Sequence, residues 1–329
     1  MKKVIIQKNQ AGGRMDKFLF KYLSQAGSGF IYRMLRKKNI TLNGKKADGK
    51  EKLCQGDEIC FFFSDETFEK FSGTAEAEKK DIEEYPYIPL AIVYEDENVL
   101  FLNKPAGMLS QKAEKKDFSI NEYAIGYLLS SGRISREELH TFKPSVCNRL
   151  DRNTSGLITV GASMEGTRAL AYGFKERTFD KYYLCIVSGK TAGHKRISGS
   201  LVKDEKTNKV TVHAGAVGDS YIETEYETLF SNGEISVLKV KLITGKTHQI
   251  RAHLAFLGHP ILGDPKYGDA RVNEYYRKKF GVKYQLLHSW QLHIPDSQQG
   301  CLSGLAGKVF QAQVPEVYGR ITGTVSYTH

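Results

Sequence analysis

Three short segments of the chain place charged side chains next to turns, where they could carry out chemistry. In the first segment, residues 147–161, a turn rich in Asp, Asn, Ser and Gly leads directly into an apolar run. Asp151 therefore lies in a loop at the start of a buried strand, with Arg149 close before it. Loops held by a rigid sheet often carry catalytic groups, so Asp151 is a candidate catalytic carboxylate. On composition alone, an aspartate that only caps the turn is the commoner case.

The second and third segments supply a tyrosine and an arginine that could serve such a carboxylate. Residues 181–189 predict an apolar strand with Tyr183 near its start, where the ring could stack on a base or simply pack in the core. Residues 238–268 predict a half-buried strand, a turn, and a helix capped near Thr247. Arg251 lies at the front of this helix, and its guanidinium could hold a carboxylate in a bidentate pair and keep it charged.

Two patterns that would indicate a cofactor or a metal fail on spacing. A Gly-Lys-Thr triplet at residues 245–247 lacks the earlier glycine of a phosphate-binding loop, because Val240 occupies that position. His248 and His253 are five residues apart, whereas zinc-binding histidines on a helix are typically about four apart. We therefore expect no nucleotide cofactor, no metal and no other cofactor.

The first 63 residues predict a small basic unit. Apolar residues at helical spacing, from Met15 to Leu23 and again from Ile31 to Leu35, predict two amphipathic helices. The second helix also has a basic face, and short strands with an Asn-Gly turn follow it. Long cationic side chains on such a face suit an RNA backbone, although most charged helix faces are only solvated.

The ordered elements of residues 12–63 resemble an S-4-type RNA-binding domain. The resemblance rests on R-x-D-x-x-L from Arg14, the basic second helix, the I-T-L-N-G-K turn and the late Q-G-D-E-I strand. It implies that RNA is contacted by five basic residues, which are Arg33, Arg36, Lys37, Lys38 and Lys45.

Charge divides the chain into three parts. Residues 1–63 hold 14 Lys/Arg against 5 Asp/Glu, whereas residues 64–88 hold 3 against 8 and lack apolar periodicity. We therefore predict a small domain at 1–63 that forms a separate lobe, an acidic mobile linker at 64–88, and a larger domain at 89–329. The whole chain of 329 residues has a formal charge of +11, which favours a polyanionic partner such as nucleic acid.

The composition argues against a membrane-spanning or exported protein. The longest apolar runs, such as residues 59–63, are about five residues long, far short of a membrane helix. Residues 1–10 lack the apolar core of a secretory signal. The five cysteines include no C-x-x-C pair, which favours free thiols in a reducing cytoplasm. We expect a cytoplasmic protein with no membrane contact, and a monomer.

Taken in order, the three segments resemble the RluA family of pseudouridine synthases, in particular its RluC/RluD-like branch, which carries an S-4-type domain ahead of the catalytic one. The resemblance rests on R-L-D-x-x-T-S-G-L at 149–157, K-x-Y at 181–183, and T-G-K-T-H-Q-I-R-x-H-L with G-H-P-I-L-G-D-P-x-Y-G at 244–268. L-N-K-P-A-G-M at 102–108 and V-F-Q-A-Q-V-P at 309–315 are further landmarks. Asn148 stands where the family usually has His, and Lys246 where it usually has Arg.

This resemblance implies an enzyme that isomerises uridine to pseudouridine in RNA, with large-subunit ribosomal RNA as the expected substrate and the target base flipped out of its stack. It implies that Asp151 is the catalytic aspartate, that Arg251 pairs with it, and that Tyr183 packs against the base. Arg149 would lie beside the flipped nucleotide. Two further RNA contacts would come from Lys246 and His248.

The implied fold is α+β, with a mixed, largely antiparallel bent sheet around a central basic cleft, preceded by the small α/β RNA-binding domain. Asp151 should lie at the floor of that cleft, within hydrogen-bond reach of Arg251. Three other functions stay open: a pseudouridine synthase that acts on transfer RNA, a non-catalytic RNA-binding factor in ribosome assembly, and a nucleoside or glycoside hydrolase. The hydrolase would need two carboxylates, and only Asp151 stands out.

Overall fold

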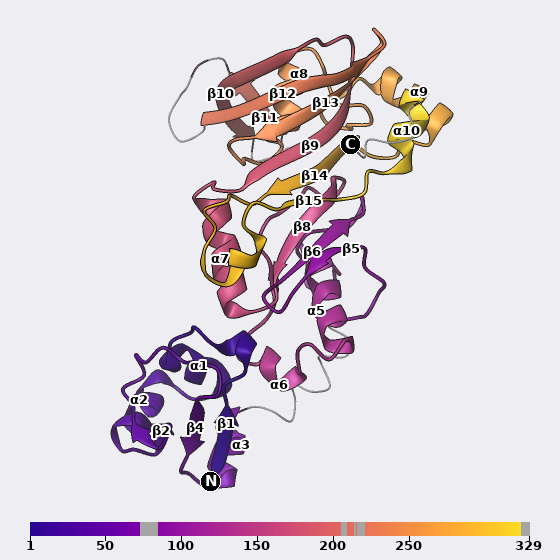
Figure 1. Ribbon diagram of the computed structural model, residues 1–329. Coiled ribbons are helices and arrows are strands. Elements are labelled where there is room, and N and C mark those ends of the chain that lie inside the picture. Colours follow the sequence, from indigo (N-terminus) through magenta and orange to yellow (C-terminus); the bar gives the residue numbers. More distant parts are fainter. Residues whose placement is uncertain (73–84, 205–208, 214, 216–220, 324–329) are drawn as a thin grey trace.

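The structure is a computed structural model that describes residues 1–72, 85–204, 209–213, 215 and 221–323. Two separate sheets organise it, one of four strands and one of eleven. We call the part around the smaller sheet, residues 1–72, the N-terminal unit, and residues 85–323 the main unit. Figure 1 shows the two units end to end, with the N-terminal unit at the bottom.

The N-terminal unit is a small antiparallel sheet, in the order β1-β4-β2-β3, packed against helices. Its elements are β1 (Lys2–Ile5), η1 (Lys8–Gln10), α1 (Met15–Tyr22), α2 (Ser28–Arg36), β2 (Ile40–Leu42), β3 (Lys45–Lys46), β4 (Glu58–Phe61) and α3 (Asp65–Ser72). The two amphipathic helices are where the sequence predicts them. Met15, Leu19 and Ile31 are fully buried in one cluster, so the apolar face of each helix forms the core.

The segment predicted as a linker from residue 64 begins differently. Residues Asp65–Ser72 form helix α3, and Phe68 is only 3% exposed because its ring packs into the N-terminal core. The prediction missed this helix because Phe68 and Phe71 are its only aromatic residues among many charged ones. Most of the remaining predicted linker, residues 73–84, lies outside the described residues.

The main unit is built around the larger sheet, with helices between some strands and, among the described residues, only strands from β9 to β13. Its elements are β5 (Ile92–Glu95), β6 (Val99–Lys104), α5 (Ile120–Ser130), α6 (Arg136–Leu139), β7 (Ser145–Val146), β8 (Ser155–Gly161), α7 (Met164–Lys175), β9 (Asp180–Ser188), β10 (His194–Asp204), β11 (Lys209–His213), β12 (Tyr221–Ser231), β13 (Ile235–Leu242), α8 (Gln249–Phe256), α9 (Ala270–Phe280), β14 (Leu287–His293), η3 (Gly300–Leu305), β15 (Val309–Gln311) and α10 (Glu316–Thr322).

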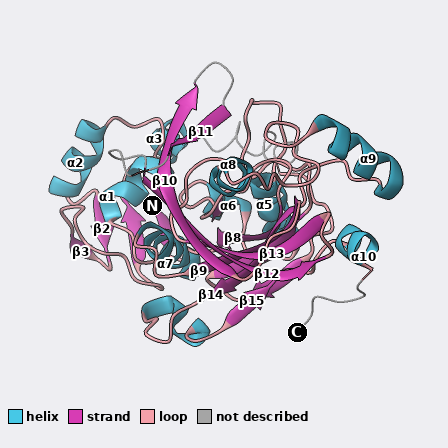
Figure 2. Cartoon of the chain, turned by 90° about the horizontal axis from the view of Figure 1, so that it is seen from above, coloured by secondary structure: helices cyan, strands magenta, loops and turns pink. Residues whose placement is uncertain are grey.

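The large sheet is mixed and mostly antiparallel, as predicted. Its path runs β11-β10-β12-β13-β9-β14-β8-β6-β5, with β15 paired to β14 and β7 paired to β8. The pair β14–β8 is parallel, and it joins the strands around β9 to those around β6. Figure 2 shows how the strands curve, with α5 and α8 over the same side of the sheet.

Strand alternation explains how helices cover both faces of the β6–β8 pair. Leu100 and Leu102 pack with residues of α5, whereas the intervening Phe101 packs with Leu170 of α7 and with η3. Successive residues of a strand point to opposite faces, so each face acquires its own apolar layer. The loop before β8, which contains Asp151, is therefore attached to a strand that is buried on both sides.

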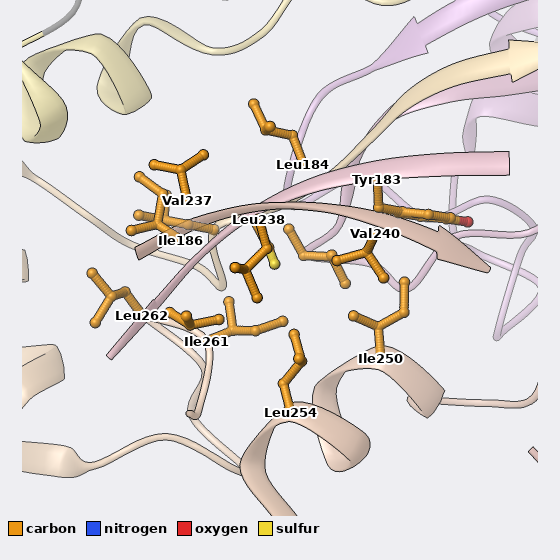
Figure 3. Packing of buried hydrophobic residues seen from close by; sticks show 14 of the residues in the cluster. Tyr183, Leu184, Ile186, Val237, Leu238, Val240, Ile250, Leu254, Ile261 and Leu262 are labelled. Carbon is orange, nitrogen blue, oxygen red and sulfur yellow. The ribbon is translucent and has the colours of Figure 1, made fainter. Parts of the chain in front are cut away.

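Helix α8 is held on the sheet by an apolar cluster from β9 and β13. Figure 3 shows Ile250 of α8 directed toward Val240, and Leu254 directed toward the same strands beside Ile261. Ile250 is 4% exposed and Leu254 is fully buried. The predicted helix is thus present, although it begins at Gln249 and is preceded by His248 in a left-handed conformation, with φ of 55°, rather than by a Thr247 cap.

The N-terminal unit contacts the main unit directly, which differs from the predicted separate lobe. The amide of Gln10 donates a 2.7 Å hydrogen bond to the hydroxyl of Thr141, and Lys21 Nζ lies 2.9 Å from the carbonyl oxygen of Thr141. Arg168 on α7 donates to the carbonyl of Gly12. The sequence could not predict this contact because its partners are more than a hundred residues apart.

None of the helices among the residues that the structure describes combines the length and hydropathy that a bilayer crossing requires.

Candidate active site

Asp151, Arg251 and Asp264 form a chain of charged side chains where the β7–β8 loop meets α8, with Arg251 and Asp264 buried and Asp151 partly exposed. Arg251 Nη1 donates to Asp151 Oδ2 at 2.7 Å. Arg251 Nε and Nη2 donate to the two oxygens of Asp264 at 2.7 and 2.9 Å. The guanidinium therefore uses its fork on Asp264 and one remaining donor on Asp151, which is the contact that the sequence predicts between Arg251 and Asp151.

The two aspartates that contact Arg251 differ in their exposure to solvent. The Asp151 side chain is 28% exposed, whereas the Asp264 side chain is 0% exposed. Asp264 Oδ1 also accepts hydrogen bonds from the backbone N–H groups of Lys266 and Tyr267, at 2.8 and 3.1 Å. Asp264 is thus an anchor inside the protein, and Asp151 is the carboxylate that a substrate can reach.

The electrostatics of this chain keep the arginine charged. Burial lowers the pKa of Arg251, but the bonds to Asp264 and Asp151 outweigh that effect and raise the pKa overall. Arg251 is 4% exposed, so its charge is poorly screened by solvent. Arg251 therefore presents a fixed positive charge to the partly exposed carboxyl group of Asp151.

Two aromatic side chains complete one wall of the site. His248 Nε2 lies 3.8 Å from Asp151 Oδ2, and His248 Nδ1 lies 3.1 Å from the hydroxyl of Tyr267. The Tyr267 ring also lies beneath the guanidinium of Arg251, with 5.3 Å from Cζ to the ring centroid. Burial lowers the pKa of His248, and the charge of Asp151 opposes that shift. His248 therefore contacts the carboxylate as a mostly neutral ring near pH 7.

Tyr183 supplies an apolar surface beside the carboxylate. It is 7% exposed and lies on β9, in the cluster that holds α8. Burial raises the pKa of its hydroxyl to about 12, and the charge of Asp151 adds to that shift. The phenol therefore stays protonated at neutral pH and can serve as a stacking or packing surface.

Lys104 restrains the loop that carries Asp151 through hydrogen bonds to backbone carbonyls. The residue is 0% exposed, and its ammonium donates to three backbone carbonyls, those of Pro105 at 3.0 Å, Met108 at 2.8 Å and Arg152 at 3.1 Å. Burial lowers its pKa to about 8, and the charge of Asp151 opposes that shift. Because Arg152 follows Asp151 directly, this ammonium restrains the backbone next to the carboxylate.

The other predicted site residues lie farther out. Arg149 and Lys246 are exposed, on the loop before β8 and on the turn before α8 respectively. Asn148, which departs from the family pattern, accepts 2.7 and 3.0 Å hydrogen bonds from the backbone N–H and hydroxyl of Thr159, so it holds the loop against β8. The five basic residues of the N-terminal unit are all exposed, on α2 and the segments that follow it.

Sequence reasoning did not find the roles of Asp264 and Lys104. Both stand inside the motifs that carried the family resemblance, but nothing in their spacing shows that one grips Arg251 and the other the Asp151 loop. The only local signal for Asp264 is its position. It lies in a loop rich in glycine and proline that directly follows the helix of Arg251. Among the residues that the structure describes, no cluster of His, Cys, Asp and Glu could hold a metal ion.

Comparison with known proteins identifies the family of this chain. The family model for RNA pseudouridylate synthase matches residues 98–256. The ribosomal large subunit pseudouridine synthase C of Vibrio cholerae serotype O1 is 30% identical over 86% of this chain and 85% of its own length. Ribosomal large subunit pseudouridine synthase D of Borreliella burgdorferi is 31% identical over 83% of this chain and 80% of its own length. In fold, human RNA pseudouridylate synthase domain containing 4 is similar, with a TM-score of 0.52, 22% identity, and coverage of 69% of this chain and 90% of that one.

The chain therefore belongs to the RNA pseudouridylate synthase family, as the resemblance of its motifs to the RluA family predicts. It is an RNA pseudouridine synthase, an enzyme that isomerises uridine within RNA.

Proposed function

We propose that this enzyme forms pseudouridine in large-subunit ribosomal RNA, with Asp151 as its catalytic residue. The observation that supports the assignment of Asp151 most directly is the 2.7 Å bond from Arg251, which holds a partly exposed carboxyl group in a fixed orientation. The ribosomal substrate is the one that the names of the C and D relatives state.

In this proposal the residues around Asp151 divide the work of the isomerisation. The bond from the ribose to the uracil nitrogen breaks, the uracil turns, and a bond forms to carbon 5. Carbon 5 loses its hydrogen as a proton and the freed nitrogen gains one, so the product is an isomer of the substrate. Asp151 acts on the flipped nucleotide as a nucleophile or by stabilising the sugar cation. Tyr183 packs against the base, so that the freed uracil stays in place, and Arg149 lies next to the flipped nucleotide. Arg251 positions Asp151.

RNA outside the site would be held by exposed cations on both units. On the main unit this cation is Lys246, exposed on the turn before α8, and the half-buried ring of His248 beside Asp151 adds an uncharged contact. On the N-terminal unit the exposed cations are Arg33, Arg36, Lys37, Lys38 and Lys45. Such side chains bind phosphates without reading sequence. We also propose that the enzyme works without a nucleotide or other cofactor, because the isomerisation needs no redox change and no external energy. We propose further that it acts as a monomer in the cytoplasm.

The substrate class is tested with RNA labelled with tritium at carbon 5 of uracil, because pseudouridine formation releases that label to water. Large-subunit ribosomal RNA and total transfer RNA, both from cells that lack this enzyme, are incubated separately with catalytic amounts of protein. The proposal expects more than one release per enzyme molecule from ribosomal RNA and none from transfer RNA. Release from transfer RNA alone would replace the ribosomal substrate with transfer RNA.

A further inference from the structure

The contact between the N-terminal and main units has the character of a protein interior. Gln10 is 5% exposed and Thr141 is 2% exposed, and the hydrogen bond that joins their side chains is buried. Arg168 on α7 reaches across to the carbonyl of Gly12, and Lys8 pairs with Glu97 at the rim. Buried polar partners that satisfy each other define one orientation, because any other leaves them unpaired.

Two neighbouring glycines allow the units to approach this closely. A Cβ added to Gly12 would lie 2.8 Å from Cγ of Glu165, and one added to Gly13 would lie 2.8 Å from Sδ of Met164. Gly12 has φ of +82°, which itself favours glycine, whereas Gly13 has an ordinary backbone. The nearest obstruction to a side chain at Gly13 is the end of the Met164 side chain of the other unit, so a bulky side chain at this position would press on the contact.

The contacted helix is mechanically linked to the active site. Met164 and Glu165 form the first turn of α7, which directly follows β8, and the loop with Asp151 directly precedes β8. Leu170 and Gly173 are buried on the face of α7 that packs on the sheet. A unit docked on the start of α7 is consequently held at a fixed distance from Asp151.

We propose that this docked contact makes the N-terminal unit a rigid arm that selects the target uridine. The exposed cations of α2 would then bind a second element of the RNA, at a set distance and orientation from the nucleotide that enters the site. The preferred substrate is therefore a folded RNA with a neighbouring double-helical element, and a lone hairpin that contains the uridine lacks that element. This inference rests on the proposed function, because it assumes RNA substrates that are large and folded.

The experiment separates docking from catalysis by substituting Gly13→Leu. This variant is compared with Gly304→Leu, an exposed glycine that has no atoms within 4 Å of an added Cβ and no positive φ. Each protein is assayed on full-length large-subunit ribosomal RNA and on a short hairpin that carries the same uridine, mapped beforehand with wild type. Small-angle scattering on the full chain reports whether the units have separated.

The rigid arm predicts a specific pattern. Gly13→Leu increases the radius of gyration and lowers kcat/KM on the long RNA by about tenfold through KM, the effect of losing one favourable contact. Its kcat/KM on the hairpin stays equal to that of wild type, which shows that the main unit is folded. Adding Met164→Ala, which removes the obstructing sulfur, restores activity on the long RNA. Arg168→Ala removes a contact to Gly12 from the main-unit side, and it lowers kcat/KM on the long RNA in the same way as Gly13→Leu.

Other outcomes overturn the inference. If the units separate but the long RNA is modified as fast as by wild type, the arm does not select the substrate. Equal losses on the long RNA and the hairpin would mean that the contact only stabilises the fold. If wild type releases no tritium from ribosomal RNA at all, the proposed substrate fails first, which distinguishes that result from a failure of the arm.

Discussion

Arg251 is the residue on which the geometry of the site depends. It holds two carboxylates at once, with its fork on the fully buried Asp264 and its third nitrogen on Asp151. A planar guanidinium can do this because its donors point in fixed directions, whereas an ammonium is a compact charge with no fixed fork. Asp264 therefore orients the arginine, and the arginine orients the partly exposed carboxyl group of Asp151.

The first prediction concerns Arg251→Lys. The lysine keeps a positive charge, so the buried Asp264 is not left without a counter-charge, but one ammonium cannot reproduce three directed bonds. We expect kcat to fall by about a hundredfold, as for the loss of a positioning contact of a few kcal/mol, with KM nearly unchanged. Tritium release under single-turnover conditions measures the chemical step. Activity within a factor of about two of wild type would show that charge alone suffices.

The second prediction concerns pH and the buried His288. Its Nδ1 lies 2.9 Å from the hydroxyl of Ser155 and its Nε2 lies 3.4 Å from the carbonyl of Ala312, and burial lowers its pKa to about 4. The unfolded chain, with an ordinary histidine pKa, binds this proton more readily between pH 6.5 and 4. The free energy of unfolding therefore falls as pH drops through that window, by about 3 kcal/mol for this residue.

His288→Gln removes this titration and keeps an amide that can donate to Ala312. Urea unfolding at pH 7 and pH 4 should show a smaller loss of stability in the variant than in wild type. The comparison between the two proteins cancels the acid response of the other groups. Equal losses in both proteins would contradict the assignment of a neutral, buried His288.

At the scale of elements, pairing between distant strands explains what the sequence could and could not predict. The half-buried strand around Leu238 and Val240, the helix of Arg251, and both amphipathic N-terminal helices follow from local periodicity. The parallel pairing of β8 with β14 has no local signal, because His288 and Ser155 are 133 residues apart. Helix α3 was missed for a local reason. Phe68 is its one buried apolar residue, and a single apolar residue does not produce the helical periodicity from which a helix is predicted.

The third prediction tests that parallel pairing at Gly156. A Cβ there would lie 2.1 Å from the carbonyl oxygen of Ser289 on β14, and φ is +108°. Gly156→Ala must push the two strands apart or strain the backbone, so we expect a loss of about 3 kcal/mol in the free energy of unfolding. The exposed Gly304→Ala should change it by less than about 0.5 kcal/mol. Urea unfolding of both variants checks this, and equal stabilities would contradict the close pairing.

At the scale of the whole molecule, charge is spread over both units. The N-terminal unit carries exposed cations on and just after α2, including Arg36 and Lys37, whereas Arg251 contacts Asp151 in the main unit. Composition indicated a polyanionic partner, and the motifs identified RNA. The docking of the N-terminal unit was not predictable, because an acidic stretch without periodicity resembles a free linker whether or not the unit it joins is docked.

The fourth prediction concerns this distribution of charge. If Lys37 contacts an RNA phosphate, Lys37→Ala should weaken binding of large-subunit ribosomal RNA and reduce the slope of log affinity against log salt by about 1. Lys308, which is exposed in the main unit just before β15, provides the control. Lys308→Ala should leave the slope as in wild type. Filter binding over a salt series measures both, and equal slopes for the two variants would exclude Lys37, at the end of α2, from the RNA interface.

The most direct test of the account compares wild type with Asp151→Asn on ribosomal RNA labelled with tritium at carbon 5 of uracil. Asparagine keeps the size of the side chain and can still accept a hydrogen bond from Arg251, but it cannot act as a carboxylate. We expect wild type to release more than one tritium per enzyme molecule and Asp151→Asn to release none, while both proteins bind the RNA with similar affinity. Release by Asp151→Asn at the rate of wild type would contradict the central role of Asp151.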